Sequence, residues 1–492
     1  MIGFDNGEYL RLQSEQIRKR IGQFGGKLYL EFGGKLYDDN HASRVLPGFE
    51  PDSKLRMLCE LRDEVEILIV ISAGDIEKNK VRGDLGISYD EDVLRLIDVF
   101  RGRSLPVGGV VVTRWEGQPT AQAFVRRLEA LNVRVWKHGN IEGYPYDVER
   151  IVSDEGFGSN EYIETTGRLV VVTAPGPGSG KLATCLSQIY HEYKRGIPAG
   201  YAKFETFPIW NLAIDHPVNL AYEAATADLS DVNVVDHFHR SAHDEEAVNY
   251  NRDMEAFPVL SAMFRRILGE CPYQSPTDMG VNMAGFCIVD DEVCRAASRR
   301  EIVRRYYIAA TDRVKGTATE ETVQKLKSLM VRADISARDC PEITAALRKE
   351  EDTGAPAAAM TLSDGRLVTG KTSAFMGCCS SLLVNALKEL GQIPDEVKLI
   401  SEEIMEPITR MKTESLGANN PRLHSDETLI ALCACSVQDP HARRAVEQLG
   451  RLSGCEAFFS VIISTEDEQL YKSLGINVSC QPRYETKKLY HR

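Results

Sequence analysis

A glycine-dense segment between residues 174 and 184 is the part of the sequence best suited to bind an anion. It follows an apolar stretch, Leu169–Thr173, and precedes residues 182–194, whose pattern predicts a helix. Glycines in such a turn let backbone N–H groups converge on phosphate oxygens, and the N-terminus of the helix adds its partial positive charge. The candidate ligand-binding residues here are Gly176, Gly178, Ser179, Gly180 and Lys181, and Lys181 is also a candidate catalytic residue that would stabilise charge on a phosphate.

This segment departs from the consensus P-loop at two positions. Pro175 stands where the first glycine belongs, and Leu182 replaces the serine or threonine whose hydroxyl binds magnesium. Ser179 or Thr184 could replace that hydroxyl, or the loop could bind a phosphorylated metabolite without a metal. The sequence therefore leaves the cofactor open. It could be a nucleotide, with or without Mg²⁺, or there could be none. A tight strand-to-helix turn that binds nothing is the alternative interpretation.

A group of basic residues follows the apolar stretch that ends at Ser72. Ligand sites in open α/β sheets lie beyond the carboxyl ends of the strands, so the loop over residues 73–84 and the glycine-dense segment are expected to share one crevice. Lys78 and Arg82 are the candidate ligand-binding residues of this loop, because they would help to neutralise a phosphate. A solvated loop without a ligand is the alternative.

Three of the ten histidines lie in the cluster from Asp236 to Glu246. If this segment is helical, His239 and His243 lie one turn apart on one face, a spacing at which two histidines can bind a metal. A helix that begins at the surface with Asp236 as its cap is the commoner reason for such a segment, so we assign no metal ligands. Because histidine titrates near neutral pH, His239 and His243 are candidate catalytic acid and base residues instead.

The segment from His191 to Arg195 begins like the zinc-protease motif His-Glu-x-x-His, but Arg195 replaces the second histidine. One histidine on that helical turn cannot hold zinc in the manner of this motif. Zinc-protease activity is therefore disfavoured.

Two segments nearer the C-terminus also combine chemically active side chains. Gly370-Lys371-Thr372 follows an apolar stretch but lacks the upstream glycine of a P-loop, and we interpret it as a turn into the next helix. Residues 419–427 contain an arginine, a histidine and two carboxylates, which suits either acid–base chemistry or a helix cap formed by Ser425 or Asp426. We favour the cap.

The elements that must position these residues follow from the apolar pattern. Strand-like runs alternate with amphipathic stretches in the first half of the chain, which is typical of a parallel sheet with crossover helices. The sequence therefore predicts a multi-lobed α/β protein with a Rossmann-like lobe over residues 1–235, a mainly helical subdomain over 236–355 and a second α/β lobe over 356–492. The predicted strands of the first lobe are Lys27–Phe32, Glu66–Ser72, Val107–Arg114, Val133–His138, Leu169–Ala174 and Tyr201–Phe207.

Two short stretches carry predictions of their own. Phe24–Tyr29 recurs eight residues later as Phe32–Tyr37, and we interpret the second Gly-Gly as the turn of a hairpin. The alternative is that this Gly-Gly lets a ligand approach the backbone beside Lys35. Residues 352–359, Asp-Thr-Gly-Ala-Pro-Ala-Ala-Ala, have the composition of a linker.

Composition excludes several classes of protein. The chain has 492 residues, of which 43% are hydrophobic and 27% are charged, as in globular proteins with several domains. Its 59 basic and 72 acidic residues give a net charge of −13, which argues against a nucleic-acid partner. No apolar run approaches the roughly 20 residues of a membrane span, and the N-terminus lacks signal-peptide features, so we expect a cytoplasmic protein without a membrane partner. A homo-oligomer is compatible with a chain of this size.

Several long motifs resemble one bacterial family over nearly the whole chain. This family is known as domain of unknown function 1846, and some of its members carry the label ATP-dependent zinc protease, which Arg195 contradicts here. The resemblance implies a multi-lobed α/β fold with a small helical subdomain, and it implies no established activity or catalytic residue. Besides the glycine-dense segment, the motifs that carry it are Phe32–Leu36, His41–Phe49, Ala202–Leu212, Pro217–Leu229 and Ser275–Met283.

Two classes of function remain after these exclusions, beside a scaffold in which the glycine-dense segment only turns the chain. The first is an enzyme that binds a nucleotide or another small phosphorylated ligand at Gly176–Lys181, with the reaction class open among transferase, ligase and hydrolase. The second is a non-catalytic binding or sensor protein, whose two α/β lobes close around an anionic ligand. The sequence leaves open whether the chain is an enzyme.

Overall fold

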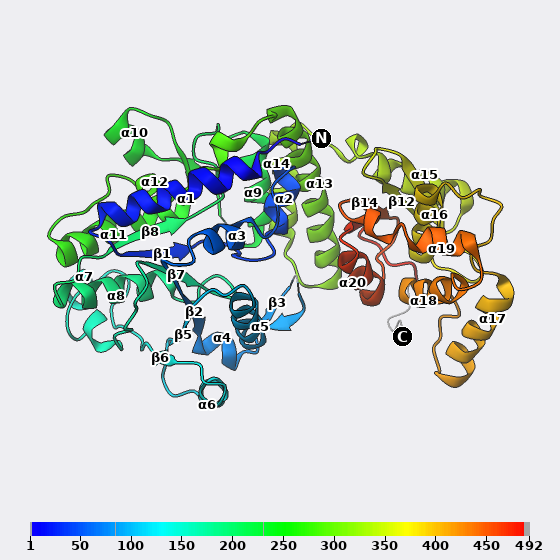
Figure 1. Cartoon of the computed structure of the whole chain (residues 1–492). Helices are drawn as coiled ribbons and strands as arrows, with labels where there is room; N and C mark the ends of the chain where they lie inside the picture. The colour runs from blue at the N-terminus through cyan, green and yellow to red at the C-terminus, as the bar shows by residue number, and fades with distance from the viewer. Residues whose placement is uncertain (1, 84, 230, 487–492) are drawn as a thin grey trace. The chain divides into compact units, whose positions relative to one another are not determined.

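The computed structural model describes residues 2–83, 85–229 and 231–486, and it divides the chain into two compact units. The N-terminal unit comprises residues 1–298, and the C-terminal unit comprises residues 299–492 (Figure 1). Both units combine helices with a β-sheet, which confirms the predicted α/β class.

A seven-stranded sheet forms the centre of the N-terminal unit, and its strands follow the order β11-β8-β1-β7-β2-β5-β6. Every neighbouring pair is parallel. Six of the strands confirm the six predicted from the sequence, and the two-residue strand β11 was not predicted. Their bounds are β1 Leu28–Phe32, β2 Val65–Ser72, β5 Val107–Thr113, β6 Val135–Lys137, β7 Leu169–Thr173, β8 Gly200–Phe204 and β11 Gly280–Val281.

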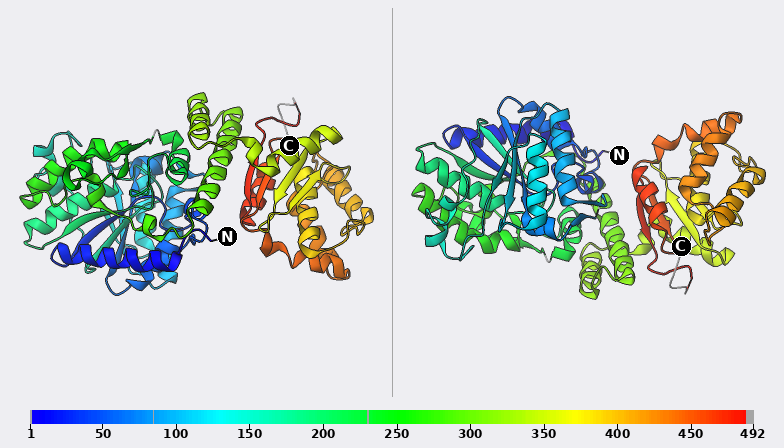
Figure 2. Two further views of the ribbon diagram at one scale, coloured as in Figure 1. Left: turned by 90° about the horizontal axis from the view of Figure 1, so that it is seen from above. Right: turned by 90° about the horizontal axis from the view of Figure 1, so that it is seen from below.

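Helices cover both faces of this sheet (Figure 2). Leu68 and Val70 of β2 belong to a core that also contains buried residues of α8 and α11, whereas Ile67 and Ile69 face the opposite side and are equally buried. On that side α5 contacts β2 and β5, and α1 contacts β8 and β11. Strands buried on both faces read as continuous apolar runs, which is why the sequence predicted them.

The remaining elements of the N-terminal unit are mostly short. Its helices are α1 Asn6–Gln23, α2 Asn40–Val45, α3 Ser53–Glu60, α4 Ala73–Glu77, α5 Tyr89–Gly102, α6 Pro119–Ala130, α7 Val148–Ile151, α8 Lys181–Lys194, α9 Pro217–Ala225, α10 His237–His243, α11 Asn251–Leu268 and α12 Pro276–Met279. Two small antiparallel pairs, β3 Val81–Arg82 with β4 Ile87–Ser88 and β9 Asn233–Val235 with β10 Val248–Tyr250, complete it.

Strands β1 and β7 flank the point where the sheet topology reverses. The connection that follows β1 leads to β2, which lies on the far side of β7 in the sheet. The connection that follows β7 leads the other way, to β8, which lies on the far side of β1. Connections that run in opposite directions from two adjacent parallel strands leave a crevice at their carboxyl ends, and such crevices commonly bind ligands.

The hairpin predicted after β1 is wrong. β1 pairs in parallel with β7 on one side and β8 on the other, so no position is left for a return strand. Gly33 N–H donates to the carbonyl oxygen of Phe204 at 2.9 Å, which holds the second Gly-Gly at the carboxyl end of β1 beside β8.

The helices expected between residues 236 and 355 are present, and they contribute to both units. Helix α13, Asp291–Lys315, crosses the boundary at residue 298, and α14, Glu320–Arg332, and α15, Pro341–Thr353, belong to the C-terminal unit. The three-part division at residues 235 and 355 stays a prediction.

The C-terminal unit contains a four-stranded sheet with the order β13-β12-β14-β15. β12 is antiparallel to both of its neighbours, and β14 and β15 are parallel. The strands and helices of this unit after α15 are β12 Ala357–Thr361, β13 Leu367–Lys371, α16 Cys378–Gly391, α17 Glu402–Arg410, α18 Ser425–Cys435, α19 Pro440–Val446, β14 Glu456–Phe459, α20 Thr465–Ser473 and β15 Asn477–Cys480.

Two sequence interpretations in this unit are wrong. The expected linker over residues 352–359 ends in Ala357–Ala359, which begin β12 and are fully buried. Helices contact β12 on both sides, α15 on one and α16 on the other, so small side chains are needed there. Gly370 and Lys371 form the end of β13 rather than a turn.

Candidate ligand-binding site

The carboxyl ends of β1 and β7 bring together the glycine-dense segment and charged residues at one edge of the sheet. The segment connects β7 to α8, and Lys181 is the first residue of that helix. Its side chain interacts electrostatically with Glu31 of β1 and Lys203 of β8, whose backbones are paired in the sheet. The sequence predicted the loop at this edge but not Glu31 or Lys203.

Two glycines of the segment are required by their surroundings. A Cβ atom on Gly176 would lie 2.2 Å from the hydroxyl oxygen of Tyr89, at the start of α5. Gly180 has a φ of 93°, in the left-handed region, and a Cβ there would lie 3.1 Å from Thr113 of β5. Thr113 Oγ1 also donates to the carbonyl oxygen of Ser179 at 2.6 Å. These contacts fix the path of the loop over the sheet edge.

Polar groups without partners face this edge. Within the part of the chain that the structure describes, the hydroxyl oxygens of Ser179 and Ser72 are buried and have no hydrogen-bond partner, and their residues are 2% and 1% exposed. The first backbone N–H groups of any α-helix have no intrahelical acceptor. At the N-terminus of α8 no described side chain caps them either. Unsatisfied donors at the end of a helix are typical of an anion-binding site.

Burial lowers the pKa of Lys181, while attraction to the Glu31 carboxylate opposes this effect and repulsion from Lys203 adds to it. A bound anion would reverse the shift, because negative charge next to the ammonium group favours its protonated form.

Lys203 forms the centre of a compact ionic network. Its ammonium group lies 2.6 Å from Glu205 and also pairs with Asp253 and the hydroxyl of Tyr250. Tyr250 in turn donates to Glu205 at 3.0 Å. Burial and the nearby Asp253 raise the pKa of Glu205, against the attraction of Lys203. Although burial alone would lower the pKa of Lys203, attraction to Asp253, Glu205 and Glu31 raises it.

Sequence analysis overlooked this network, although one signal for it was present. In β8 and the residue after it, Lys203 and Glu205 alternate with the buried Ala202 and Phe204 at the end of an apolar strand. Such alternation at the carboxyl end of a parallel strand points two charged side chains to the same face.

The basic residues of the loop over 73–83 have different environments. Arg82 is buried and pairs with Asp92 at 2.9 Å, so its charge is already neutralised within the fold. Lys78 is exposed at the end of α4. Lys80 lies over the ring of Tyr89 at 5.0 Å, which places this loop beside Gly176. The ligand-binding roles of Lys78 and Arg82 stay predictions, and the buried ion pair of Arg82 makes a direct role for it less favourable.

The histidine cluster lies beside a cavity of about 160 Å³ in the N-terminal unit. As predicted, the segment is helical and Asp236 caps it, accepting a hydrogen bond from His239 N–H at 2.9 Å. The cavity is lined by His239 and also by Glu205, so the ionic network and the cluster border the same space. The acid–base roles of His239 and His243 stay predictions.

Two other predicted motifs have structural roles. Glu192 of the zinc-protease-like segment is fully buried and accepts a hydrogen bond from Tyr29 at 2.7 Å, and Lys27 pairs with the same carboxylate. At the start of α18 the cap is His424, the residue before Ser425, rather than Ser425 or Asp426 as predicted, and its N–H donates to Glu427 at 2.7 Å.

None of the described helices has both the length and the apolar character needed to cross a membrane. The molecule is a two-unit α/β protein with charged residues at the carboxyl edge of its N-terminal parallel sheet. Residues 2–334 match the N-terminal part, and residues 338–490 the C-terminal part, of a family described as domain of unknown function DUF1846. The chain belongs to this uncharacterised family.

Relatives of the chain carry the name UPF0371 protein. One from Corynebacterium aurimucosum is 55% identical over 487 residues, which cover 99% of this chain and 98% of the relative. Another from Corynebacterium diphtheriae is 55% identical over 492 residues, or 100% of this chain and 99% of the relative. A third, from Streptococcus pneumoniae, is 52% identical over 489 residues and 99% of each chain.

Proposed function

We propose that the N-terminal unit binds a small phosphorylated ligand, such as a nucleotide or a phosphorylated metabolite, in the crevice between β1 and β7, and that the chain is an enzyme acting on it. The observation that carries this proposal is the loop Gly178–Lys181 at the topological switch point. There a lysine, a buried hydroxyl without a partner among the described residues and a helix that no described side chain caps lie close together.

The chemistry of the crevice suits a phosphate with a hydroxylated group attached. The N–H groups at the start of α8 and the hydroxyl of Ser179 are donors for phosphate oxygens, and Lys181 supplies a compensating charge. Glu31, which accepts a hydrogen bond from Tyr201 at 2.9 Å, offers its remaining acceptor capacity to the hydroxyl groups of a sugar. Anion and hydroxyl groups would therefore be recognised on the two sides of the switch point.

Glu205 is the residue of this region best suited to move a proton. Burial and Asp253 raise its pKa against the attraction of Lys203, and a carboxyl group with a raised pKa is a common general acid or base in enzymes. It lies in the wall of the cavity and also beside the carboxyl end of β1, where a Cβ on Gly33 would lie 3.6 Å from its Cγ. The reaction class is open among transferase, ligase and hydrolase.

Thermal unfolding in the presence of nucleotides and sugar phosphates, each with and without Mg²⁺, tests binding. A ligand at 100 times its dissociation constant adds about 2.7 kcal/mol to the free energy of unfolding. We expect at least one compound to stabilise the wild type and Lys194→Ala, since Lys194 is exposed at the opposite end of α8, but not Lys181→Ala. If no compound stabilises the wild type, or if Lys181→Ala responds equally, the proposal is wrong.

Turnover separates an enzyme from a binding protein. The stabilising compound is incubated with the wild type and followed by phosphorus NMR. Water is the only acceptor in one sample, and amines or alcohols are added as acceptors in the others. An enzyme changes the phosphorus signal and Glu205→Gln slows that change. An unchanged signal with intact binding supports the non-catalytic sensor or binding protein instead.

A further inference from the structure

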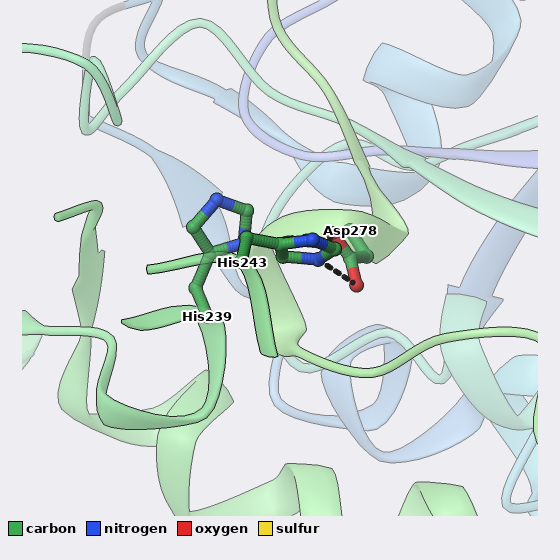
Figure 3. Close-up of side chains that lie close together, drawn as sticks. All are labelled: His239, His243 and Asp278. Carbon is green, nitrogen blue, oxygen red and sulfur yellow. Dashed lines mark hydrogen bonds and ion pairs between the residues drawn. The ribbon is translucent and has the colours of Figure 1, made fainter. Parts of the chain in front are cut away.

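Three potential metal ligands lie close together (Figure 3), and two of them, His239 and Asp278, line the cavity. His239 and His243 lie one turn apart on α10, and Asp278 lies on α12, some 35 residues further along the chain. One donor atom from each lies within 4.8 Å of the others. The sequence showed the two histidines, but Asp278 is too distant in the chain for spacing to reveal it.

The distances between these donors are close to those of a coordination sphere. Nε2 of His243 lies 3.0 and 3.1 Å from the two carboxylate oxygens of Asp278, and Nδ1 of His239 lies 3.5 Å from Oδ1. Because metal–nitrogen and metal–oxygen bonds are about 2.0–2.2 Å long, neighbouring ligand atoms of a tetrahedral or octahedral site lie roughly 3.0–3.5 Å apart. A small shift of the side chains would admit an ion.

A buried carboxylate holds the two ligand-bearing helices together. Asp236 is fully buried, and it accepts hydrogen bonds from His239 N–H of α10 and from the N–H and hydroxyl groups of Thr277 of α12, at 2.9, 3.1 and 2.7 Å. Ser275 accepts from Asp278 N–H at 3.0 Å and lies 3.0 Å from Nδ1 of His239. Supporting contacts of this kind fix the orientation of metal ligands.

The second ring nitrogen of His239 is unsatisfied. His239 is 7% exposed, and its Nε2 atom is buried without a hydrogen-bond partner among residues 2–83, 85–229 and 231–486. A buried polar atom without a partner is destabilising, because its lost contacts with water are not replaced. The open atom is Nε2, whereas Nδ1 is the nitrogen that lies 3.5 Å from Asp278, so the imidazole keeps capacity for a molecule in the cavity in addition to its place among the three donors.

We propose that His239, His243 and Asp278 bind a divalent first-row transition-metal ion. Two imidazoles and one carboxylate form a donor set suited to such ions, whereas Mg²⁺ and Ca²⁺ prefer oxygen ligands. Three protein ligands leave coordination positions free for water or for an oxygen atom of a molecule in the cavity. In this role the two histidines are ligands rather than an acid and a base.

This metal site does not depend on the phosphate-binding loop. Its donors belong to α10 and α12, and no residue of the segment over 176–181 takes part. The proposal about the loop can fail while this one holds, and the reverse is also true.

Titration of the metal-free protein with Zn²⁺ by calorimetry tests the site, with Mg²⁺ as the comparison ion. We expect the wild type to bind one Zn²⁺ ion in preference to Mg²⁺. His243→Ala and Asp278→Asn are expected to weaken Zn²⁺ binding at least 100-fold, and the asparagine retains an acceptor for Gln274 N–H. His237→Ala is the matched control, because His237 is exposed on the same helix and outside the group, and should bind like the wild type.

Co²⁺ provides a second measurement at the same site. Visible absorption bands of bound Co²⁺ without a thiolate charge-transfer band would indicate nitrogen and oxygen ligands, and they should disappear in His243→Ala. Circular dichroism shows whether each variant is folded. Absence of Zn²⁺ binding by the wild type, equal binding by a folded His243→Ala, or a thiolate band that survives in that variant would each overturn the proposal.

Discussion

A Gly-Lys pair follows an apolar stretch in each unit, and the two pairs have different structural positions. Gly180-Lys181 lies beyond the carboxyl end of β7, a central parallel strand, where the chain turns into α8. Gly370-Lys371 lies inside β13, an edge strand antiparallel to β12. The first pair faces the crevice of the sheet, whereas the second belongs to the sheet itself.

The two glycines are needed for different reasons. Gly180 adopts a left-handed conformation that starts a helix, whereas a Cβ on Gly370 would lie 2.4 Å from the backbone nitrogen of Leu382 in α16. Gly370 therefore permits close packing of a helix on a strand. Lys371 is exposed, while Lys181 is half-buried beside Glu31. The comparison shows that strand direction and the next connection, rather than the residue pair, decide whether such a motif can bind a ligand.

Gly370→Ala should produce a large loss of stability at every pH. The added methyl group would overlap the backbone of α16, which cannot move as a side chain can, and overpacking of this kind costs about 1–3 kcal/mol. Urea unfolding monitored by circular dichroism measures the loss, and binding of a phosphorylated ligand at the N-terminal unit should be unchanged.

Gly450→Ala is the matched control for this substitution in the same unit. Its Cβ would meet no atom within 4 Å, and its φ lies outside the left-handed region, so we expect a change below about 0.5 kcal/mol. Equal stability of the two variants would show that α16 does not approach β13 as closely as described.

The two units should respond to pH in opposite directions. Burial raises the pKa of Glu456 in the C-terminal unit to about 7, despite Arg304 and Arg300, so the folded chain holds this proton more tightly and its stability falls as pH rises from 4.5 to 7. Burial lowers the pKa of His138 in the N-terminal unit to about 4, so that the unfolded chain takes up the proton first and stability falls as pH drops from 6.5 to 4.

Single variants separate the two effects. Calorimetric unfolding of the wild type, Glu456→Gln and His138→Gln is compared from pH 4 to 7.5. As pH rises, the stability of the wild type relative to Glu456→Gln should fall by on the order of 3 kcal/mol. As pH drops, the stability of the wild type relative to His138→Gln should fall by a similar amount. Differences that do not vary with pH would contradict the buried environments of both side chains.

Much of the N-terminal fold could be predicted because burial on both faces of a parallel sheet leaves continuous apolar runs. The same reasoning failed at Ala357–Ala359, where short side chains between two helices look like a linker. It failed again at Gly33, because local sequence suggests a hairpin turn while strand pairing is decided by β7 and β8.

The candidate sites were predictable only in their local parts. The glycine-dense loop and the pair His239 and His243 are visible in the sequence, because each depends on neighbours a few residues apart. Glu31 and Asp278 come to these groups from segments far away in the chain. Only the order of the strands and the contact between α10 and α12 place them there.

Ser179→Ala and Ser373→Ala compare the loop before α8 with the loop after β13. Each substitution removes one hydroxyl group, so these are the smallest structural changes proposed. The buried hydroxyl of Ser179 has no partner within the described ranges, so its removal should change the free energy of unfolding by less than about 0.5 kcal/mol. Ligand affinity should fall about 3- to 10-fold, the equivalent of one hydrogen bond to the phosphate.

Ser373 should show the reverse. Its hydroxyl accepts a hydrogen bond from Met376 N–H at 3.1 Å, so Ser373→Ala should cost about 0.5–1.5 kcal/mol of stability and leave ligand affinity unchanged. Thermal unfolding and calorimetric titration on the same samples give both quantities. A loss of stability without a loss of affinity in Ser179→Ala would place its hydroxyl among the contacts that hold the turn, and the two loops would then differ in geometry but not in function.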